Sequence, residues 1–367
     1  MRRSWGKGSQ GAFLSVVIPV HDVARWLPAC LDSVLVQPVG GLQVVVVDDG
    51  STDGSSEILA DYTARESRME LLSQENSGVS IARNNAIRQC TGEYLTFVDP
   101  DDVLPEDAWS SMLATLDRTG SDFAVGRAER VDKQRRFVTP LMERNHRRQR
   151  LGIRIEDQPL MLADVFVWNK IFRRSFWDRA GIEFPERTRY QDQPALTRAF
   201  LAAESFDVLT ETVYDWAVRP SGGSATQLRR DLDNLQERVA TKRMTADMVA
   251  AHGSAELHRV LHAEIFPIDM WEHFRAVPRA DEEYWTVLRD AVREFWGEHT
   301  VRFELTTIPV QQRLMGCLVA QGRRDDLIEL IAFLDGFPGS SPVVNGRLQH
   351  PWADDPSLPR EVTIVRR

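Results

Sequence analysis

Cysteine is scarce in this 367-residue chain, which contains only three. Cys30, Cys90 and Cys317 lie far apart and are odd in number, so they form neither a disulfide framework nor a zinc-binding spacing. A chain with so few cysteines is typical of a reducing compartment, and we expect a cytoplasmic protein.

Long hydrophobic runs are also missing. No stretch approaches the roughly 18 apolar residues that a membrane-spanning helix needs. The basic residues of Met1–Gly11 are not followed by an apolar segment, so we expect a disordered N-terminus and no signal peptide. Any association with a membrane is therefore expected to be peripheral contact with its cytoplasmic face.

Positive charge is in deficit. Lys and Arg total 45 against 54 Asp and Glu, which gives a formal net charge of −9. This balance argues against nucleic-acid binding by bulk electrostatics. The chain is nevertheless 43% hydrophobic, which is enough to bury a core, and its length suggests two domains.

Short apolar runs alternate with helical patterns through the first 226 residues. Apolar, β-branched segments predict strands at Ser15–Val20, Leu42–Val47, Met69–Ser73, Tyr94–Val98, Ser121–Val125 and Val213–Trp216. This alternation predicts an α/β sheet with helices on both faces, whose ligands bind at the carboxyl ends of the strands. His21, Asp49 and Asp99 each follow such an end, so we expect one site there.

The stretch Tyr94–Asp102 ends in three carboxylates, Asp99, Asp101 and Asp102. Close like charges repel one another, and a hard divalent cation removes that repulsion. The alternative is an aspartate-rich turn, with Asp102 near the start of a helix that Pro105 opens and that carries acidic residues in its first turn. We expect Asp99 and Asp101 to bind metal and Asp102 to support them.

The segment Arg127–Arg154 is strongly basic and includes HRRQR at His146–Arg150. It is interpreted either as a solvated, mobile loop or as a surface for a phosphate-rich acceptor.

After about Thr226 the chain has helical periodicity only, which predicts a separate helical domain over 227–336 with its aromatic residues in the core. We expect residues 337–367 to be a β-like tail with a strand at Glu361–Val365, as at the start of a further module.

Several fragments together resemble the family 2 glycosyltransferases, which are inverting enzymes of the GT-A fold. The fragments are SVVIPVH, VVVVDDGSTDGS, NSGVSIARNNAI, YLTFVDPDD, VWNKIF and YQDQ. The resemblance covers Ser15 to about Thr226 and implies a Rossmann-like mixed sheet followed by the helical region. The helical addition and the VWNKIF segment resemble the branch that builds teichoic acids and other envelope polymers.

The resemblance also implies a role for individual residues. It implies that Asp49 accepts a hydrogen bond from the uracil N3–H and that His21 lies against the base. The nucleotide-binding positions are Pro19, Val20, His21, Asp49, Asn76, Arg83, Asp99 and Pro100. Asp99 and Asp101 form the DxD element and are expected to hold Mn²⁺ or Mg²⁺. Asp192 is the expected catalytic base, although Gln191 stands where the family often has Glu. Asp22 stands where the family usually has Asn.

Four further residues are candidates for diphosphate or acceptor contacts: Arg219, Ser224, Lys170 and Gln191. Arg219 lies in a Gly- and Ser-rich loop and is either a lid over the diphosphate or a surface arginine. Lys170 either touches phosphate or forms a structural ion pair.

We therefore expect a metal-dependent, inverting transfer of N-acetylglucosamine or a hexose from a UDP-sugar to a hydroxyl of a polymer such as wall teichoic acid. Other acceptors remain open, namely exopolysaccharide, a lipid-linked glycan or a small molecule, and so does a homo-oligomer formed through the C-terminal region. A nucleotidyltransferase is disfavoured because HDVARW, not a Gly-rich basic loop, follows the first strand. A non-catalytic polymer-binding module would not need Asp99, Asp101 and Asp192.

Overall fold

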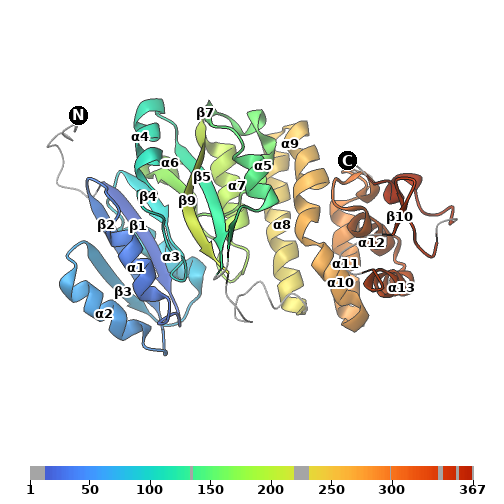
Figure 1. Cartoon of the computed structure of the whole chain (residues 1–367), viewed down its shortest axis with the longest axis horizontal. Coiled ribbons are helices and arrows are strands. Elements are labelled where there is room, and N and C mark those ends of the chain that lie inside the picture. The colour runs from blue at the N-terminus through green and yellow to red at the C-terminus, as the bar shows by residue number, and fades with distance from the viewer. Residues whose placement is uncertain are drawn as a thin grey trace. The chain divides into compact units, whose positions relative to one another are not determined.

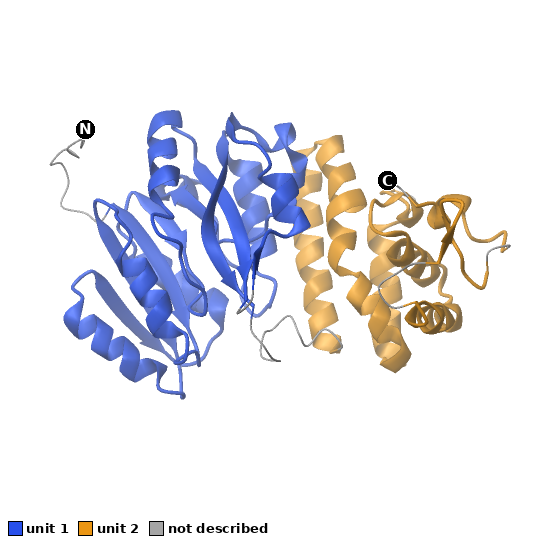
Figure 2. Cartoon of the chain, viewed as in Figure 1, with its two compact units in different colours: residues 1–222 blue, residues 223–367 orange. Residues whose placement is uncertain are grey.

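The chain consists of two compact units, residues 1–222 and 223–367 (Figure 2). The computed structural model describes residues 13–132, 135–218, 231–297, 299–337, 342–352 and 355–365. The first unit combines a β-sheet with helices, and the second consists mainly of helices (Figure 1). This arrangement confirms the predicted fold class.

The described part of the first unit contains a nine-stranded sheet with the strand order β3-β2-β1-β4-β8-β5-β9-β7, and β6 pairs with β5. The strands are β1 (Leu14–Val20), β2 (Leu42–Asp49), β3 (Met69–Gln74), β4 (Tyr94–Phe97), β5 (Phe123–Val131), β6 (Arg136–Phe137), β7 (Arg150–Ile153), β8 (Lys170–Arg173) and β9 (Phe206–Ala217). The pairs β1–β2, β2–β3, β1–β4 and β5–β9 are parallel. β8 runs antiparallel to β4 and β5, and β7 runs antiparallel to β9, so the sheet is mixed.

The central strands are covered on both faces. Every residue of β1 and β2 is buried, which explains why their sequences are continuous valine-rich runs and do not alternate with polar residues. Val16, Ile18 and Val20 share one core cluster with apolar residues of the helices that follow β1 and β4. The helix that follows β3 packs on β1 and β2.

The helices of the first unit lie mostly where the apolar periodicity predicts them. They are α1 (Leu27–Leu35), α2 (Ser55–Arg65), α3 (Val79–Gln89), α4 (Ser110–Thr119), α5 (Pro140–Asn145), α6 (Arg174–Arg179) and α7 (Asp192–Ala202).

The predicted helix start at Pro105 is wrong, because α4 begins only at Ser110. Asp107 has a left-handed φ of 59°, which is incompatible with a right-handed helix. The Gln37 side chain instead holds this segment as a turn, since it donates to the Pro105 carbonyl and accepts from the Ala108 N–H.

The prediction of one solvated loop over Arg127–Arg154 is also wrong. The described part of this segment contains the end of β5, then β6, α5 and β7. His146 is buried within it and contacts the Leu209 carbonyl of β9 through Nδ1 at 2.8 Å. A buried histidine therefore fastens the basic segment to the sheet.

The second unit is helical up to its tail. Its α-helices are α8 (Leu232–His252), α9 (Ala255–Val260), α10 (Trp271–Ala276), α11 (Glu282–Phe295), α12 (Val310–Gln321) and α13 (Arg324–Asp335). α9 and α10 are separated by a π-helical turn and by a 3-10 turn that contains Pro267, which lacks the N–H that an α-helix needs. The aromatic residues predicted for the core, among them Phe266, Phe274 and Trp296, are buried.

The tail contains a short hairpin, β10 (Val343–Val344) and β11 (Arg347–Leu348). The predicted strand at Glu361–Val365 is wrong, since Arg360–Thr363 forms a 3-10 helix after Pro359. Within the described ranges, no helix of either unit has the length and apolar character that a membrane span requires.

Candidate functional site

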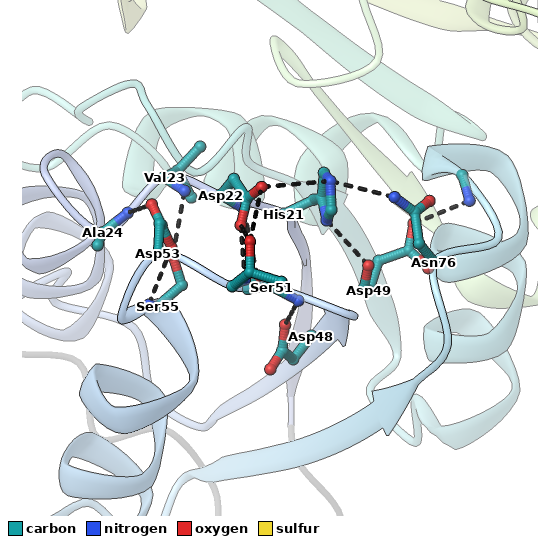
Figure 3. Close-up of polar contacts among 12 residues, drawn as sticks. His21, Asp22, Val23, Ala24, Asp48, Asp49, Ser51, Asp53, Ser55 and Asn76 are labelled. Carbon is teal, nitrogen blue, oxygen red and sulfur yellow. Dashed lines mark hydrogen bonds and ion pairs between the residues drawn. The ribbon is translucent and has the colours of Figure 1, made fainter.

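The loops after β1, β2 and β3 meet at His21. The His21 ring donates from Nδ1 to the Asp49 carbonyl at 2.9 Å and accepts at Nε2 from the Asn76 amide at 3.1 Å (Figure 3). Gly50, between these loops, has a φ of +73°, and a Cβ there would come within 2.8 Å of the Asn76 nitrogen. Three of the predicted nucleotide-binding residues are thus brought together by loops that only glycine allows to approach so closely.

The Asp49 carboxylate lies behind His21 and is 4% exposed. It accepts from the Gln74 side chain and from the backbone N–H groups of Ser77 and Gly78, each at 2.8 Å. Two carboxylate oxygens offer about four acceptor positions, so three bonds leave capacity for one more donor. The sequence did not identify these three partners, because nothing marks Gln74 or two backbone amides as ligands of an acid.

The neighbouring Asp48 carboxylate has different partners. It accepts from the Ser51 N–H at 3.0 Å and from the Ser56 hydroxyl, which fixes the turn before α2. Burial raises the pKa of Asp48, but these serine hydrogen bonds outweigh it and lower the pKa below its ordinary value. The two adjacent aspartates therefore support different loops.

Asp22 has a structural explanation that the sequence did not provide. Its φ is 49°, in the left-handed region that Asn and Asp tolerate better than other non-glycine residues. Its carboxylate accepts from the Thr52 N–H at 2.7 Å and lies 3.7 Å from His21 Nε2 (Figure 3). Asp22 therefore ties the β1 loop to the β2 loop beside His21.

The aspartate-rich turn after β4 is fastened to β9 by Asp102 and Tyr214. The Tyr214 hydroxyl accepts from the Asp99 N–H and donates to the Asp102 carboxylate, both at 3.0 Å. Asp102 also accepts from the Ala217 N–H at 2.8 Å and is 2% exposed. Burial raises the pKa of Asp102 well above its usual range, and the negative charges of Asp101 and Asp99 add to this effect. Asp102 is thus a supporting residue, while Asp99 and Asp101 remain partly exposed.

Arg83 joins the aspartate-rich turn to the predicted base. Its guanidinium donates from Nη2 to Asp99 Oδ1 at 2.8 Å and from Nη1 to Asp192 Oδ1 at 2.6 Å. The Arg83 side chain is 3% exposed and stacks against Phe184, with 5.1 Å between the guanidinium carbon and the ring centroid. One buried cation therefore holds the DxD aspartate and the predicted base within reach of each other.

Asp192 lies in the first turn of α7, where the helix dipole favours a negative charge. Its side chain is 24% exposed. Burial raises the pKa of Asp192, the charge of Asp99 raises it further, and the charges of Arg83 and Lys170 oppose this shift. A raised pKa makes the ionised form of this carboxylate a stronger proton acceptor than an ordinary aspartate.

Lys170 belongs to a closed network in the core. Its ammonium nitrogen lies within 2.9 Å of four oxygens, on Asp164 (two), Phe166 and Asn169. The Asp164 carboxylate also contacts His146 at 3.0 Å, and the Lys170 side chain is fully buried. The structural ion pair is therefore the correct alternative for Lys170 in this state.

Several buried polar atoms around Asp192 have no hydrogen-bond partner among the described residues. They include Ser80 Oγ and Arg83 Nε on α3, together with the amide oxygens of Gln191 and Gln193. Unsatisfied buried groups are rare in native proteins, and a bound ligand or water is one explanation. Gln191, which precedes Asp192 in the chain, thus has an unused acceptor, and its contact with diphosphate or acceptor stays a prediction.

The remaining predicted residues are placed as follows. Pro19 and Val20 are buried in β1, and Pro100 is buried between the two DxD acids. Arg219 and Ser224 lie outside the described residues. Among the residues that the structure describes, no three His, Cys, Asp or Glu side chains are grouped to hold a metal ion.

Comparison with known proteins shows which family this chain resembles in sequence and fold. The model of the glycosyl transferase family 2 matches residues 15–179. The uncharacterized glycosyltransferase EpsJ of Bacillus subtilis (strain 168) is 28% identical over 242 residues, which cover 62% of this chain and 68% of EpsJ. The poly(ribitol-phosphate) beta-N-acetylglucosaminyltransferase TarS of Staphylococcus aureus (strain Mu50) is 26% identical over 245 residues, which cover 65% of this chain and 42% of TarS.

Among solved structures, S. aureus TarS 1–349 in complex with UDP-GlcNAc superposes with a TM-score of 0.61 at 19% identity, covering 93% of this chain and 97% of that chain. This likeness supports the GT-A fold. The chain carries a family 2 glycosyltransferase domain over residues 15–179 and is a glycosyltransferase, as its sequence predicts.

Proposed function

We propose that the chain transfers a sugar from a UDP-sugar to a hydroxyl group of a phosphate-rich envelope polymer, with inversion at the anomeric carbon. We assign the transfer to a catalytic domain over residues 13–226. The observation that carries the proposal is the Arg83 bridge, which holds Asp99 at 2.8 Å and Asp192 at 2.6 Å. A single displacement needs a base on one side of the reacting carbon and a site for the leaving diphosphate on the other.

In this mechanism, Asp192 accepts the proton of the acceptor hydroxyl as its oxygen attacks the anomeric carbon. The raised pKa of Asp192 suits this role, since proton transfer is favoured when the base is not too weak. Arg83 keeps the Asp192 carboxylate fixed and ionised, and it is a positioning residue. One displacement inverts the configuration, because no covalent sugar–enzyme intermediate is formed.

The nucleoside end is assigned to His21, Asn76 and Asp49. Asp49 has one acceptor position left, which suits the N3–H donor of uracil. A cytosine ring has no proton at N3, so it would leave this buried carboxylate unsatisfied, and a uridine nucleotide is preferred.

Asp99 and Asp101 fit a divalent cation of the Mg²⁺ or Mn²⁺ type. Such ions are commonly bound by one or two carboxylates together with substrate phosphate oxygens, so a third protein ligand is not required. When bound, the cation supplies charge neutralisation for the departing diphosphate. Asp102 is not assigned to it, because both of its oxygens are engaged by β9.

The donor and acceptor are proposed from the relatives. TarS is described as a poly(ribitol-phosphate) beta-N-acetylglucosaminyltransferase, and its structure contains UDP-GlcNAc. These descriptions support UDP-GlcNAc as donor and a teichoic-type polymer as acceptor.

The test is UDP release from UDP-GlcNAc, UDP-glucose and UDP-galactose, each measured with Mn²⁺, with Mg²⁺ and with a chelator. We expect release with one donor, which depends on metal and increases with poly(ribitol phosphate). Absence of UDP release with every donor, even with metal, would contradict the proposal and favour a binding module. If UDP release increases only with a neutral polysaccharide, the proposed acceptor is wrong and the proposed sugar transfer stands.

A further inference from the structure

Four arginines line a pocket outside the candidate active site. The pocket is lined by Arg144, Arg147, Arg148 and Arg150, together with Asn145 and Gln158. All charged residues of this lining are positive, although the whole chain has a net charge of −9. We call this feature the arginine pocket.

The arginine pocket is held by buried structure and is not a loose basic loop. Asn145 ends α5 and is 2% exposed, and its amide donates to the Leu160 carbonyl at 3.2 Å. The next residue is the buried His146, whose ring is fixed between Leu209 and Asp164. The arginines that follow are exposed, so this anchored backbone presents cationic side chains to solvent.

The pocket has unused binding capacity. Among the described residues, Arg147 and Arg148 have no acidic or hydrogen-bonding partner. The side-chain oxygens of Asn145 and Gln158 are buried without a hydrogen-bond partner in the same set of residues. Because these oxygens only accept hydrogen bonds, they suit a hydroxyl of the polymer and not its phosphate. Clustered guanidinium groups repel one another, and a phosphate group removes that repulsion and accepts their hydrogen bonds.

The sheet register places the arginine pocket to the side of the candidate active site. In successive strand pairs, Arg150, Val208, Val125 and Lys170 lie in one row, and Lys170 begins β8 beside the end of β4, which Asp99 follows. β7 and β4 are four strand spacings apart in the order β4-β8-β5-β9-β7, which corresponds to roughly 19 Å at about 4.8 Å per spacing. An acceptor much shorter than this distance cannot contact both places.

We propose that the arginine pocket is a docking site for phosphate groups of a long phosphodiester polymer whose free hydroxyl reacts at Asp192. This inference rests on the proposed function, and it adds a second, remote contact with the acceptor. The concave, four-arginine lining suits discrete phosphate groups. A polymer that reaches both sites binds more tightly than a short one, because the second contact is then intramolecular.

The test compares Arg147→Gln/Arg148→Gln with a matched control, Arg118→Gln/Arg279→Gln. The control also removes two exposed arginines that have no partner among the described residues, and neither of them lines the pocket. Binding of fluorescent poly(ribitol phosphate) is measured without divalent cation, using one chain length well above about 20 Å and one well below. Binding to phosphatidylglycerol vesicles and metal-dependent UDP release from UDP-GlcNAc are measured in parallel.

We expect the pocket variant to bind the long polymer at least about tenfold more weakly, with a shallower salt dependence, because two phosphate contacts are lost. A short polymer occupies only one of the two places at a time, so its affinity falls less than that of the long polymer. Acceptor-free UDP release stays within about twofold of the native value, and the control variant resembles the native protein. The proposal is overturned if the pocket variant and the control variant lose affinity for the long polymer equally, or if neither loses affinity. Loss confined to the vesicles also overturns it and indicates a membrane contact. If the native protein releases no UDP but the polymer result holds, the transfer proposal fails and the docking site stands.

Discussion

Two aspartates of the first unit, Asp192 and Asp164, each pair with a buried basic side chain. Asp192 accepts from Arg83 at 2.6 Å, and Asp164 accepts from Lys170 at 2.8 Å. Around Asp164 the side chains are fully buried and the ammonium group is saturated, whereas Asp192 is 24% exposed and adjoins unsatisfied polar atoms. We call Asp164, Lys170 and His146 the closed cluster. Asp192, Arg83 and Asp99, with the neighbouring Asp101, are the open cluster, which still has capacity for a ligand.

The two carboxylates also differ in basicity. Burial raises the pKa of Asp164, but Lys170 and His146 outweigh it and lower the pKa to about 2. For Asp192, burial and the charge of Asp99 prevail over Arg83, and the pKa is raised. A carboxylate with a pKa near 2 is a poor proton acceptor, so only the open cluster is suited to general-base catalysis.

The largest effect is expected on stability, from Lys170→Met in the closed cluster. This change leaves Asp164 buried without its main counter-charge, which typically costs about 3–5 kcal/mol. Urea unfolding monitored by circular dichroism measures the loss. The matched change in the open cluster, Asp101→Ala, is expected to stay within about 1 kcal/mol of the native free energy of unfolding. Similar losses in both variants would remove the distinction between the clusters.

The next effect concerns nucleotide binding by the open cluster. Asp101→Ala is expected to weaken UDP-sugar binding in Mn²⁺ by about one to two orders of magnitude, because a carboxylate ligand of the cation is lost. Isothermal titration calorimetry measures the dissociation constant with metal and with chelator. In chelator, the variant and the native protein should bind equally. A difference that persists in chelator would show that Asp101 acts without a cation.

A smaller effect is expected from Asp49→Asn, compared with Asp48→Asn next to it. Asp49→Asn removes an acceptor for the uracil N3–H, so UDP affinity should fall by about tenfold, a typical value for one hydrogen bond to a charged group. Asp48 serves only the turn before α2 in the described structure, and its variant should keep the native preference for UDP over CDP. If Asp49→Asn kept the preference for UDP over CDP and Asp48→Asn lost it, the uracil contact would have to be assigned to Asp48.

The smallest effect is a shift in the pH dependence of transfer. Asp192 acts when ionised, so activity is lost as the pH falls through its raised pKa. Arg83 opposes that raised value, and therefore Arg83→Gln moves the acid limb of the kcat/KM profile to higher pH. Arg83→Lys keeps the charge and should move the limb less. A limb that moves to lower pH in Arg83→Gln would contradict the assignment of Asp192 as the base.

The strand ends could be predicted from sequence because buried parallel strands are continuous apolar runs. His21, Asp49 and Asp99 follow these runs directly, so their convergence was foreseeable. Arg83 and Asp192 are 109 residues apart, and Tyr214 and Asp102 are 112 apart, so their contacts depend on tertiary packing that no local pattern records. For the same reason, the sequence left both roles of Lys170 open.

The basic segment shows a second limit of sequence patterns. Its composition is typical of a solvated loop, yet the buried bonds of His146 convert it into ordered structure. A single histidine among arginines gave no sign of this. Likewise, the left-handed φ of Asp107 delays α4 past Pro105, although the residue types there are typical of a helix start.

The central claim is that the open cluster performs the transfer with Asp192 as its base, and Asp192→Asn tests it most directly. The decisive measurement is the transfer rate at saturating UDP-sugar and acceptor, with UDP-sugar affinity and unfolding free energy measured on the same preparation. Loss of a general base should lower the rate by about 10²–10⁴-fold, with affinity within about twofold. The loss of unfolding free energy should be smaller than in Lys170→Met, because the buried Arg83 keeps Asp99 as a partner. If Asp192→Asn transfers sugar at the native rate, or if its UDP-sugar affinity falls by the same factor as its rate, Asp192 is not the general base.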